Sequence, residues 1–383
     1  MSHASSPQGS PRPVPKPSFR PANLDDVDAL FQLENAAFPS DRLSRRSFRR
    51  LIAGPTDELR LAEIDGRPVG YCLVLFRAGT ALARLYSIAV HPDFAGQGLG
   101  RMLLGEAEAA ATARDAIFLR LEVRADNAPA IALYKSAGYR LFGRHEDYYE
   151  DGMEALRFEK RLSREIVPLL QPPPYFEQTT DFTCGPCCLM MALAWAKPDT
   201  KLDRALELRL WREATTIFMT SGLGGCEPFG LAVTLARRGL MVELRLSGPG
   251  PYFLESVRSD EKRTVMRLAQ HDFRQQAQMM GIPVQHQALT GAALMEALDQ
   301  GCVAIVLISG FRMFRKKVPH WVLAYAHDGH NIFIHDPWVE DEDFENQTAA
   351  ANLPIPIAEF DRMTRYGRQN LRAAVLVHKG IPA

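Results

Sequence analysis

The sequence predicts an α/β domain followed by an α+β domain. In residues 82–111, a stretch with the apolar alternation of a strand is followed by a turn with three glycines. Apolar side chains then recur at helical spacing. Residues 119–139 again give a strand, a turn and a short helix. Three consecutive prolines at 172–174 then break the chain, because proline neither continues a helix nor joins a sheet interior. With 383 residues, the chain is long enough for two or three domains.

The elements before the glycines follow from local signals. Phe19 opens a strand, and Asn23 caps a helix whose apolar face holds Val27, Leu30, Phe31 and Phe38. A second helix over 42–52 gathers four arginines on one face: Arg45, Arg46, Arg49 and Arg50. This face is either a solvated surface or a landing site for an acidic substrate or for phosphates. Strands at 58–64 and 68–76 are joined by Asp65-Gly66, a hairpin signal.

The glycines Gly96, Gly98 and Gly100 lie between a strand and a helix N-terminus. Backbone N–H groups and the helix dipole favour an anion there, and glycine lets the backbone approach a phosphate closely. The run is not G-x-G-x-x-G, and no G-K-[ST] follows it, so neither a dinucleotide fingerprint nor a P-loop fits.

The continuation carries a more specific pattern, N-x-x-A-x-x-x-Y-x-x-x-G, at Asn127, Ala130, Tyr134 and Gly138. With the glycine turn, it resembles the GNAT acetyltransferases, most closely the ribosomal-protein-alanine N-acetyltransferase branch. The resemblance covers roughly 18–160 and implies a mixed central sheet flanked by helices in a domain over 18–161. The chain departs from this family at Ala95, where arginine or glutamine is usual, so one phosphate-facing side chain is lost.

The resemblance implies acetyl-CoA as cofactor and an amine as acetyl acceptor. Glu122 would be the base that takes a proton from the amine, and Tyr134 the acid that protonates the leaving thiolate. Glu122 is otherwise an exposed strand residue or a salt-bridge partner, and Tyr134 a packing residue. Asn127 binds cofactor, caps its helix, or does both. The cofactor set is Ile88, Val90, Gly96, Gln97, Gly98, Leu99, Gly100, Arg101, Asn127 and Tyr134, and residues 148–158 form the family's closing hairpin.

The second half opens on a cysteine helix that follows a Pro-rich linker at 162–175. Cys184 lies at the helix N-terminus, a position that favours thiolate. Cys184-Gly-Pro-Cys187 is also the thioredoxin motif, but Phe182-Thr183 stand where that fold usually has tryptophan. Downstream, His320 opens one strand and Asp336 closes the next across the Asp328-Gly329 turn, so the two side chains are expected to meet.

This order resembles the peptidase C39-like family, over roughly 175–383, with a papain-like fold of helical lobe plus antiparallel sheet in a domain over 176–383. By that resemblance Cys184 is the nucleophile, His320 the base, Asp336 its orienting group and Gln178 the oxyanion donor. The chain departs from it at a helix-rich insertion near 196–290, which contains Ser221 to Cys226 and is expected to shape the substrate groove. Cys187 and Cys188 are expected to be buried helix residues.

Composition excludes several classes. A net charge of +0 argues against a bulk nucleic-acid or membrane binder, and no apolar run approaches the 18 residues that suggest a membrane span. Residues 1–17 predict a disordered Pro/Ser-rich tail rather than a signal peptide. The 6 cysteines do not form a disulfide framework, which indicates a reduced, cytoplasmic setting. His327, His330 and His335 straddle a turn, so no metal is predicted, and Arg312, Arg315, Lys316 and Lys317 form a basic loop, either solvated or a site for an acidic peptide.

The sequence therefore predicts a bifunctional enzyme, an N-acetyltransferase joined to a Cys-His-Asp peptidase or amidohydrolase. A peptidase exposes an amine and an acetyltransferase caps it, so one peptide could serve both. Two alternatives stay open: an acetyltransferase fused to a non-catalytic peptide-binding domain, and a small-molecule amine acetyltransferase with an amidase partner.

Overall fold

The computed structural model describes residues 16–162, 171–215, 218–219, 222–314, 316, 318–339 and 346–379. Most of the expected tail, residues 163–170 of the expected linker, and Ser221, Arg315 and Lys317 lie outside them. The chain forms two units. The N-terminal unit takes residues up to 76 and 83–162, and the C-terminal unit takes 77–82 and the residues from 163 on.

The N-terminal unit is built on a seven-stranded sheet in the order β1-β2-β3-β4-β5-β7-β6. Its strands are β1 (Ser18–Pro21), β2 (Asp57–Ile64), β3 (Arg67–Phe76), β4 (Leu82–Val90), β5 (Phe118–Arg124), β6 (Arg140–His145) and β7 (Ala155–Arg161). The β2–β3 hairpin turns at Asp65 and Gly66, both at positive φ, as the sequence predicts. The expected closing hairpin pairs β6 with β7, and Tyr148 and Tyr149 lie in its connection rather than in a strand.

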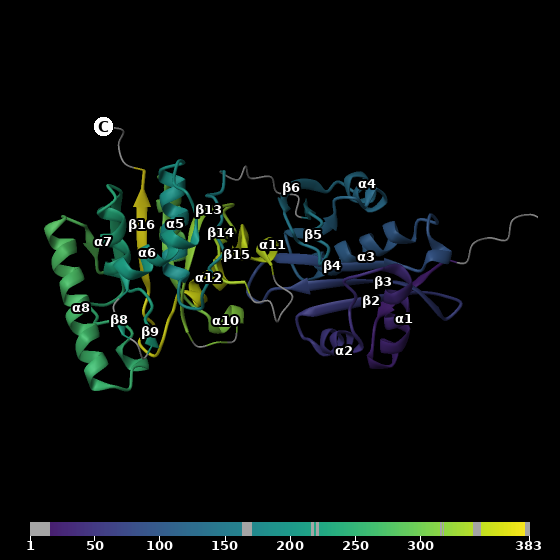
Figure 1. The fold of residues 1–383 in the computed structure, drawn as a ribbon, viewed down its shortest axis with the longest axis horizontal. Helices are drawn as coiled ribbons and strands as arrows, with labels where there is room; N and C mark the ends of the chain where they lie inside the picture. Colours follow the sequence, from purple (N-terminus) through teal and green to yellow (C-terminus); the bar gives the residue numbers. More distant parts are fainter. Residues whose placement is uncertain are drawn as a thin grey trace, which may run out of the picture. The chain divides into compact units, whose positions relative to one another are not determined.

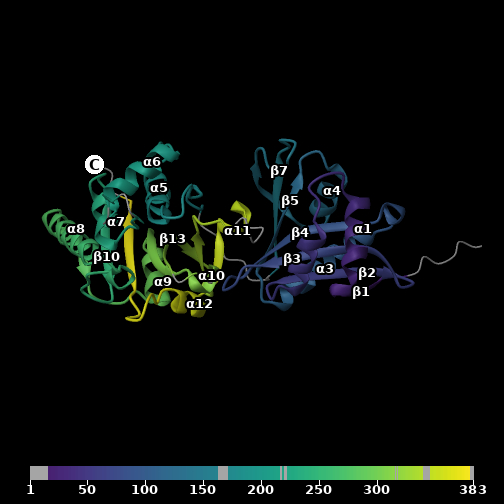
Figure 2. The same ribbon diagram turned by 60° about the horizontal axis from the view of Figure 1, so that its bottom comes forward.

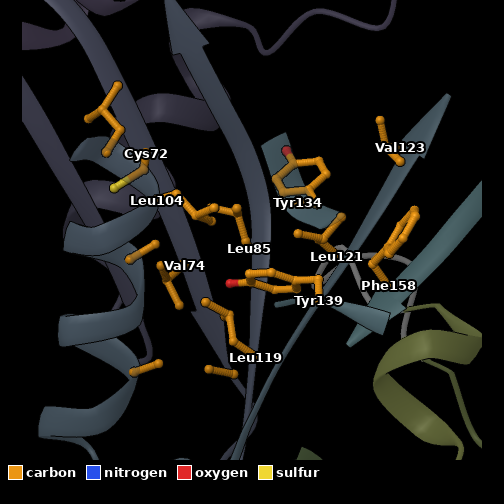
Figure 3. Close-up of a cluster of buried hydrophobic side chains, with 14 of the residues drawn as sticks. Cys72, Val74, Leu85, Leu104, Leu119, Leu121, Val123, Tyr134, Tyr139 and Phe158 are labelled. Atoms are coloured by element: carbon orange, nitrogen blue, oxygen red, sulfur yellow. The ribbon is translucent and has the colours of Figure 1, made fainter. Parts of the chain in front are cut away.

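Helices cover both faces of this sheet, as Figure 1 shows, with α1 (Val27–Ala37) and α2 (Arg45–Ala53) on one face and α3 (Leu99–Ala113) and α4 (Ala128–Ser136) on the other. Asn23 caps a short 3-10 turn, η1 (Leu24–Asp26), that leads into α1. A second 3-10 turn, η2 (Pro92–Phe94), separates β4 from α3. Figure 3 shows side chains of β3, β4, β5 and β7 meeting those of α3 and α4 in a continuous apolar core.

The C-terminal unit has its own seven-stranded sheet, ordered β11-β10-β16-β12-β13-β14-β15. The strands are β10 (Met241–Leu246), β11 (Val284–Gln285), β12 (Cys302–Ser309), β13 (Pro319–His327), β14 (Asn331–His335), β15 (Leu353–Pro356) and β16 (Ala373–His378). The pairs are antiparallel except β10 with β11, which is parallel. The expected antiparallel sheet is therefore present, with one parallel pair at its edge.

Figure 2 shows α5 (Cys184–Ala196), α6 (Arg204–Ala214) and α7 (Pro228–Ala236) on one side of this sheet, and α9 (Gly291–Asp299), α10 (Phe311–Phe314) and α12 (Ile357–Met363) on the other. The remaining elements are α8 (Asp260–Met279), α11 (Gln347–Ala350), η3 (Leu254–Ser256) and a small ribbon of β8 (Phe218–Met219) and β9 (Gly222–Leu223). The predicted insertion at 196–290 is helix-rich, but it also supplies β10 and β11 to the sheet. No described helix is long and apolar enough to cross a membrane.

Candidate active sites

The glycine turn leads directly into the 15-residue helix α3. Gly96 has φ +74° and Gly98 has φ +82°, a left-handed backbone that strains any side chain, and Gly98 is the N-cap of the helix. A Cβ placed on either glycine would meet no atom within 4 Å. The loop therefore offers open space beside a helix N-terminus, which fits a pyrophosphate.

The remaining predicted cofactor residues surround this loop. Ile88 and Val90 are partly buried on the last part of β4, and Leu99 and Gly100 form the first turn of α3. The Gln97 side chain donates to the Asp93 carbonyl oxygen at 3.2 Å. Arg101 donates to the Ser136 hydroxyl at 2.9 Å, so its guanidinium is exposed but tethered to the end of α4. Asn127 caps α4 through the Ala130 amide, as expected.

Glu122 lies on β5 in a buried ion pair, not on an exposed surface. The Arg84 guanidinium on β4 donates to Glu122 Oε2, with Nε at 2.9 Å and Nη2 at 2.8 Å. Arg84 Nη2 also donates to the Tyr148 hydroxyl at 3.1 Å. The predicted site includes Glu122 but not Arg84, since nothing in a strand pattern marks which arginine faces the neighbouring carboxylate. The ion pair favours the carboxylate form of Glu122.

Tyr134 projects from α4 into the core between β4 and β5, as Figure 3 shows beside Leu85 and Leu121. Its ring centroid lies 5.8 Å from that of Tyr139 and 6.3 Å from that of Phe158. Burial raises the pKa of the Tyr134 phenol well above its ordinary value, so the hydroxyl keeps its proton at neutral pH. A protonated phenol suits a proton donor.

Cys184 is the first residue of α5, and Pro186 occupies the first turn of the helix. All six cysteines lie in the described residues and are free thiols. Cys187 and Cys188 are fully buried, as predicted, and burial raises the pKa of both thiols well above the usual value. The Cys187 thiol donates to Glu207 Oε1 on α6 at 3.5 Å.

His320 and Asp336 meet as the strand order predicts. His320 Nε2 donates to Asp336 Oδ1 at 2.6 Å, and both side chains are buried. Burial alone would lower the pKa of His320, but the charge of Asp336, its hydrogen bond and a hydrogen bond with Cys184 raise that pKa to about 10. Because Nε2 bonds to Asp336, the hydrogen bond between His320 and Cys184 falls to the other ring nitrogen, Nδ1.

Gln178 lies on the segment that leads into α5. Its backbone N–H donates to the Pro337 carbonyl at 2.9 Å, and its side-chain amide donates to the Thr180 carbonyl at 2.9 Å. Glu207, which is not among the predicted site residues, fixes the same segment. It accepts from the Thr179 amide at 2.9 Å and from the Thr179 hydroxyl at 2.6 Å, and also from the Thr183 hydroxyl.

The side chains of two histidines of the β13–β14 hairpin have partners other than a metal. His327 Nε2 contacts Asp299 Oδ1 at 2.9 Å, and His335 Nε2 contacts the Pro173 carbonyl at 2.8 Å. Within the described part of the chain, no group of three or more His, Cys, Asp and Glu residues is arranged to hold a metal ion.

Comparison with known proteins matches each unit to a family. The model of the Peptidase_C39 like family matches residues 173–378, and that of the acetyltransferase (GNAT) family matches residues 27–139. A protein of Bacillus subtilis (strain 168) named as a [ribosomal protein bS18]-alanine N-acetyltransferase is 32% identical over 139 residues, 36% of this chain and 91% of that protein.

Two further similarities involve the same region. A mycothiol acetyltransferase of Clavibacter michiganensis is 34% identical over 138 residues, 34% of this chain but only 44% of that protein. The crystal structure of the ribosomal-protein-S18-alanine N-acetyltransferase from Escherichia coli is 28% identical, covers 40% of this chain and 99% of that chain, and has a TM-score of 0.37.

Proposed function

The chain belongs to the GNAT acetyltransferases through its N-terminal unit and to the Peptidase_C39 like family through its C-terminal unit, and from this we propose that it is a bifunctional enzyme. The first activity transfers acetyl from acetyl-CoA to the N-terminal amine of a peptide or protein. The second is a Cys184-His320-Asp336 hydrolase that acts on a peptide or amide bond, in the cytoplasm.

The observation that supports the hydrolase is the buried pair of His320 and Asp336 beside a cysteine at a helix N-terminus. In this pair His320 Nε2 lies 2.6 Å from Asp336 Oδ1. Two charged groups in a protein interior are costly unless each has a partner, so a pair aimed at a thiol is a strong functional indicator. Burial raises the pKa of the Cys187 thiol well above its usual value, which makes it a poor resolving nucleophile at neutral pH.

In the proposed hydrolysis, the proton of Cys184 resides on His320, whose raised pKa favours the imidazolium, and the sulfur attacks the scissile carbonyl carbon. The α5 N-terminus and the second N–H of the Gln178 amide stabilise the oxyanion. His320 then gives its proton to the leaving amine, and water, deprotonated by the same imidazole, releases the acyl group and restores the thiol. Asp336 keeps the ring oriented throughout.

In the proposed acetyl transfer, the cofactor would supply a thioester acetyl group. The residues that would hold it are those of the glycine turn together with Ile88, Val90, Gln97, Leu99, Arg101 and Asn127. Glu122, kept ionised by Arg84, accepts the proton that the attacking amine loses. Tyr134, kept protonated by burial, gives its proton to the departing sulfur. Both side chains lie on neighbouring elements, β5 and α4.

The relatives' names point to two classes of acetyl acceptor. Similarity over 91% of a relative named for ribosomal protein alanine favours a peptide or protein N-terminus. A second candidate, a small-molecule amine, is favoured by the similarity to a mycothiol acetyltransferase. A hydrolase in the same chain adds weight to the peptide, because hydrolysis of a peptide produces the amine that acetylation consumes.

Two assays on the full chain test the two halves. CoA release is measured with Ala-initiated peptides against small primary amines, and faster turnover on peptides is expected. Covalent capture of Cys184 by a peptide vinyl sulfone is followed by mass spectrometry. Absence of capture, together with peptide binding, would instead favour a peptide-binding domain that keeps these residues without using them.

A further inference from the structure

Asp336 has a third partner that comes from far upstream in the sequence. Residues 77–82 belong to the C-terminal unit, although they connect β3 to β4. Arg77 Nη2 donates to Asp336 Oδ2 at 2.8 Å, and Arg77 Nη1 donates to the Ala349 carbonyl at 2.9 Å. The two side chains are 4% and 0% exposed, so this is a fully buried ion pair.

The segment around Arg77 is held by further contacts. The Ala81 amide donates to the Pro354 carbonyl on β15 at 2.8 Å, so the backbone is fixed as well as the side chain. Gly79 has φ +74°, and a Cβ there would clash with Met363 of α12. The Arg77 guanidinium also lies 4.9 Å from the ring centroid of Phe314. These contacts place Arg77 in one position.

The three donors divide the Asp336 carboxylate between them. His320 Nε2 and the Trp338 amide share Oδ1, at 2.6 Å and 2.9 Å. Arg77 takes Oδ2. With a donor on each oxygen, the plane of the carboxylate is fixed, and with it the direction in which His320 is held. A buried carboxylate with the imidazole as its sole charged partner would be free to rotate or to take up a proton.

We propose that Arg77 is a positioning residue of the hydrolase site, which keeps Asp336 ionised and oriented so that His320 serves Cys184. The proposal rests on the proposed hydrolase function. It makes the β3–β4 connection a part of the thiol site, so the catalytic constellation includes a residue outside the 173–378 region that the family model matches.

The charges around Asp336 determine how loss of Arg77 would change the pKa of Asp336. Burial alone would raise the pKa of Asp336, but His320 and Arg77 together hold it below the usual value. The other titratable groups nearby are Tyr175, whose hydroxyl donates to the Asp336 carbonyl at 2.9 Å, and the thiols of Cys184 and Cys188 on α5. None of these three groups is a cation, so none of them replaces Arg77.

The test follows the rate of Cys184 alkylation against pH in the full chain, with the modified cysteine identified by mass spectrometry. In Arg77→Met the pKa of Asp336 rises, so the acid limb of the profile should move up by about 1–3 pH units. Arg77→Lys keeps the charge but not the two-pronged geometry, and should restore the position of the limb with a slower rate.

Arg372→Met is the matched control. Arg372 is also buried, pairs with Asp361 at 3.1 Å and donates to the Leu289 carbonyl at 3.1 Å, and these partners among the described residues lie outside the thiol site. It should lower thermal stability as Arg77→Met does and leave the pH profile unchanged. A second check adds Arg77→Met to Asp336→Asn, where no further movement of the limb is expected because Arg77 acts through Asp336.

The outcomes separate the two proposals. If His320→Ala abolishes rapid alkylation but Arg77→Met moves the limb no more than Arg372→Met, the positioning role is overturned and the hydrolase stands. If His320→Ala leaves alkylation unchanged, the hydrolase itself fails and the role of Arg77 fails with it. Should Arg77→Met not fold, Arg77→Lys decides: a rate and limb equal to wild type would also overturn the proposal.

Discussion

The two candidate sites are assembled in opposite ways. The acetyl-transfer site draws its loop, carboxylate and phenol from one continuous stretch, from Ile88 to Tyr134, on adjacent strands and the helices that follow them. The thiol site gathers Cys184, Glu207 and Asp336 from segments far apart in the chain, and Arg77 from between β3 and β4. The acetyl-transfer site can be recognised from a sequence motif, whereas the thiol site can be recognised from the sequence only in part.

This difference has a physical origin. Binding a phosphate group needs backbone N–H groups in a conformation that glycine adopts most easily. Glycines at fixed positions in a short segment therefore indicate such a site in the sequence. A buried charge network needs each ion to find a partner, and any segment that the fold brings near can supply it. The acetyl site is therefore expected to depend on local residues, and the thiol site on contacts across the unit.

The largest expected effect is the loss of thiol reactivity in His320→Ala. Without the imidazole, nothing accepts the Cys184 proton, and capture by a peptide vinyl sulfone should slow by about 10³-fold or more. Asp336→Asn should cost less, because it only misorients the ring. Cys187→Ala is the control and should retain capture. The reverse pattern, loss in Cys187→Ala with little change in His320→Ala, would assign the site to thioredoxin-like chemistry.

Substitutions of the proton-transfer groups in the acetyl-transfer site should lower kcat and leave cofactor affinity unchanged. Tyr134→Phe and Glu122→Gln each remove one proton-transfer group and should lower kcat about 10²–10⁴-fold with the acetyl-CoA Kd unchanged. Tyr139→Phe is the control, since Tyr139 is a buried tyrosine of the same core cluster without a proposed role. Near-wild-type turnover in Tyr134→Phe would remove its assignment as the acid.

A smaller effect is expected at the glycine turn. Gly98→Val puts a branched side chain into open space at φ +82° and should raise the acetyl-CoA Kd at least about tenfold, measured by calorimetry. Gly66→Val is the matched control, because Gly66 has φ +74° and also faces open space, but in the β2–β3 turn. It should lose stability without losing affinity. Equal affinities in the two variants would refute the phosphate-loop assignment.

The smallest expected effect is a pH-dependent part of stability. The pKa of His320 is about 10 in the folded chain, above its ordinary value, so the folded state binds the extra proton. That contribution is complete below about pH 6.5 and is lost as the pH rises toward 10. The Tm of wild type should therefore fall more than that of His320→Gln between these limits. Parallel curves would show that the pair does not titrate in this way.

Much of the fold was predictable because the signals are local. The β2–β3 turn and the strand from Leu82 to Val90 follow from turn residues and an apolar run. The meeting of His320 with Asp336 was also predicted, since a hairpin brings the start of one strand to the end of the next. The pairing of β10 with β16 was not predicted, because strands so far apart leave no mark of register.

The sequence by itself determined the glycine turn, the cysteine at a helix N-terminus and the order of the His and Asp that follow it. Each depends on backbone geometry or on neighbours along one hairpin. Only the tertiary structure decided that Arg84 neutralises Glu122, that Glu207 fixes the segment before Cys184, and that Arg77 holds Asp336. Charged residues that are far apart in the sequence form ion pairs only after folding has excluded the water between them. The spacing of residues in the sequence therefore does not show which pair will form.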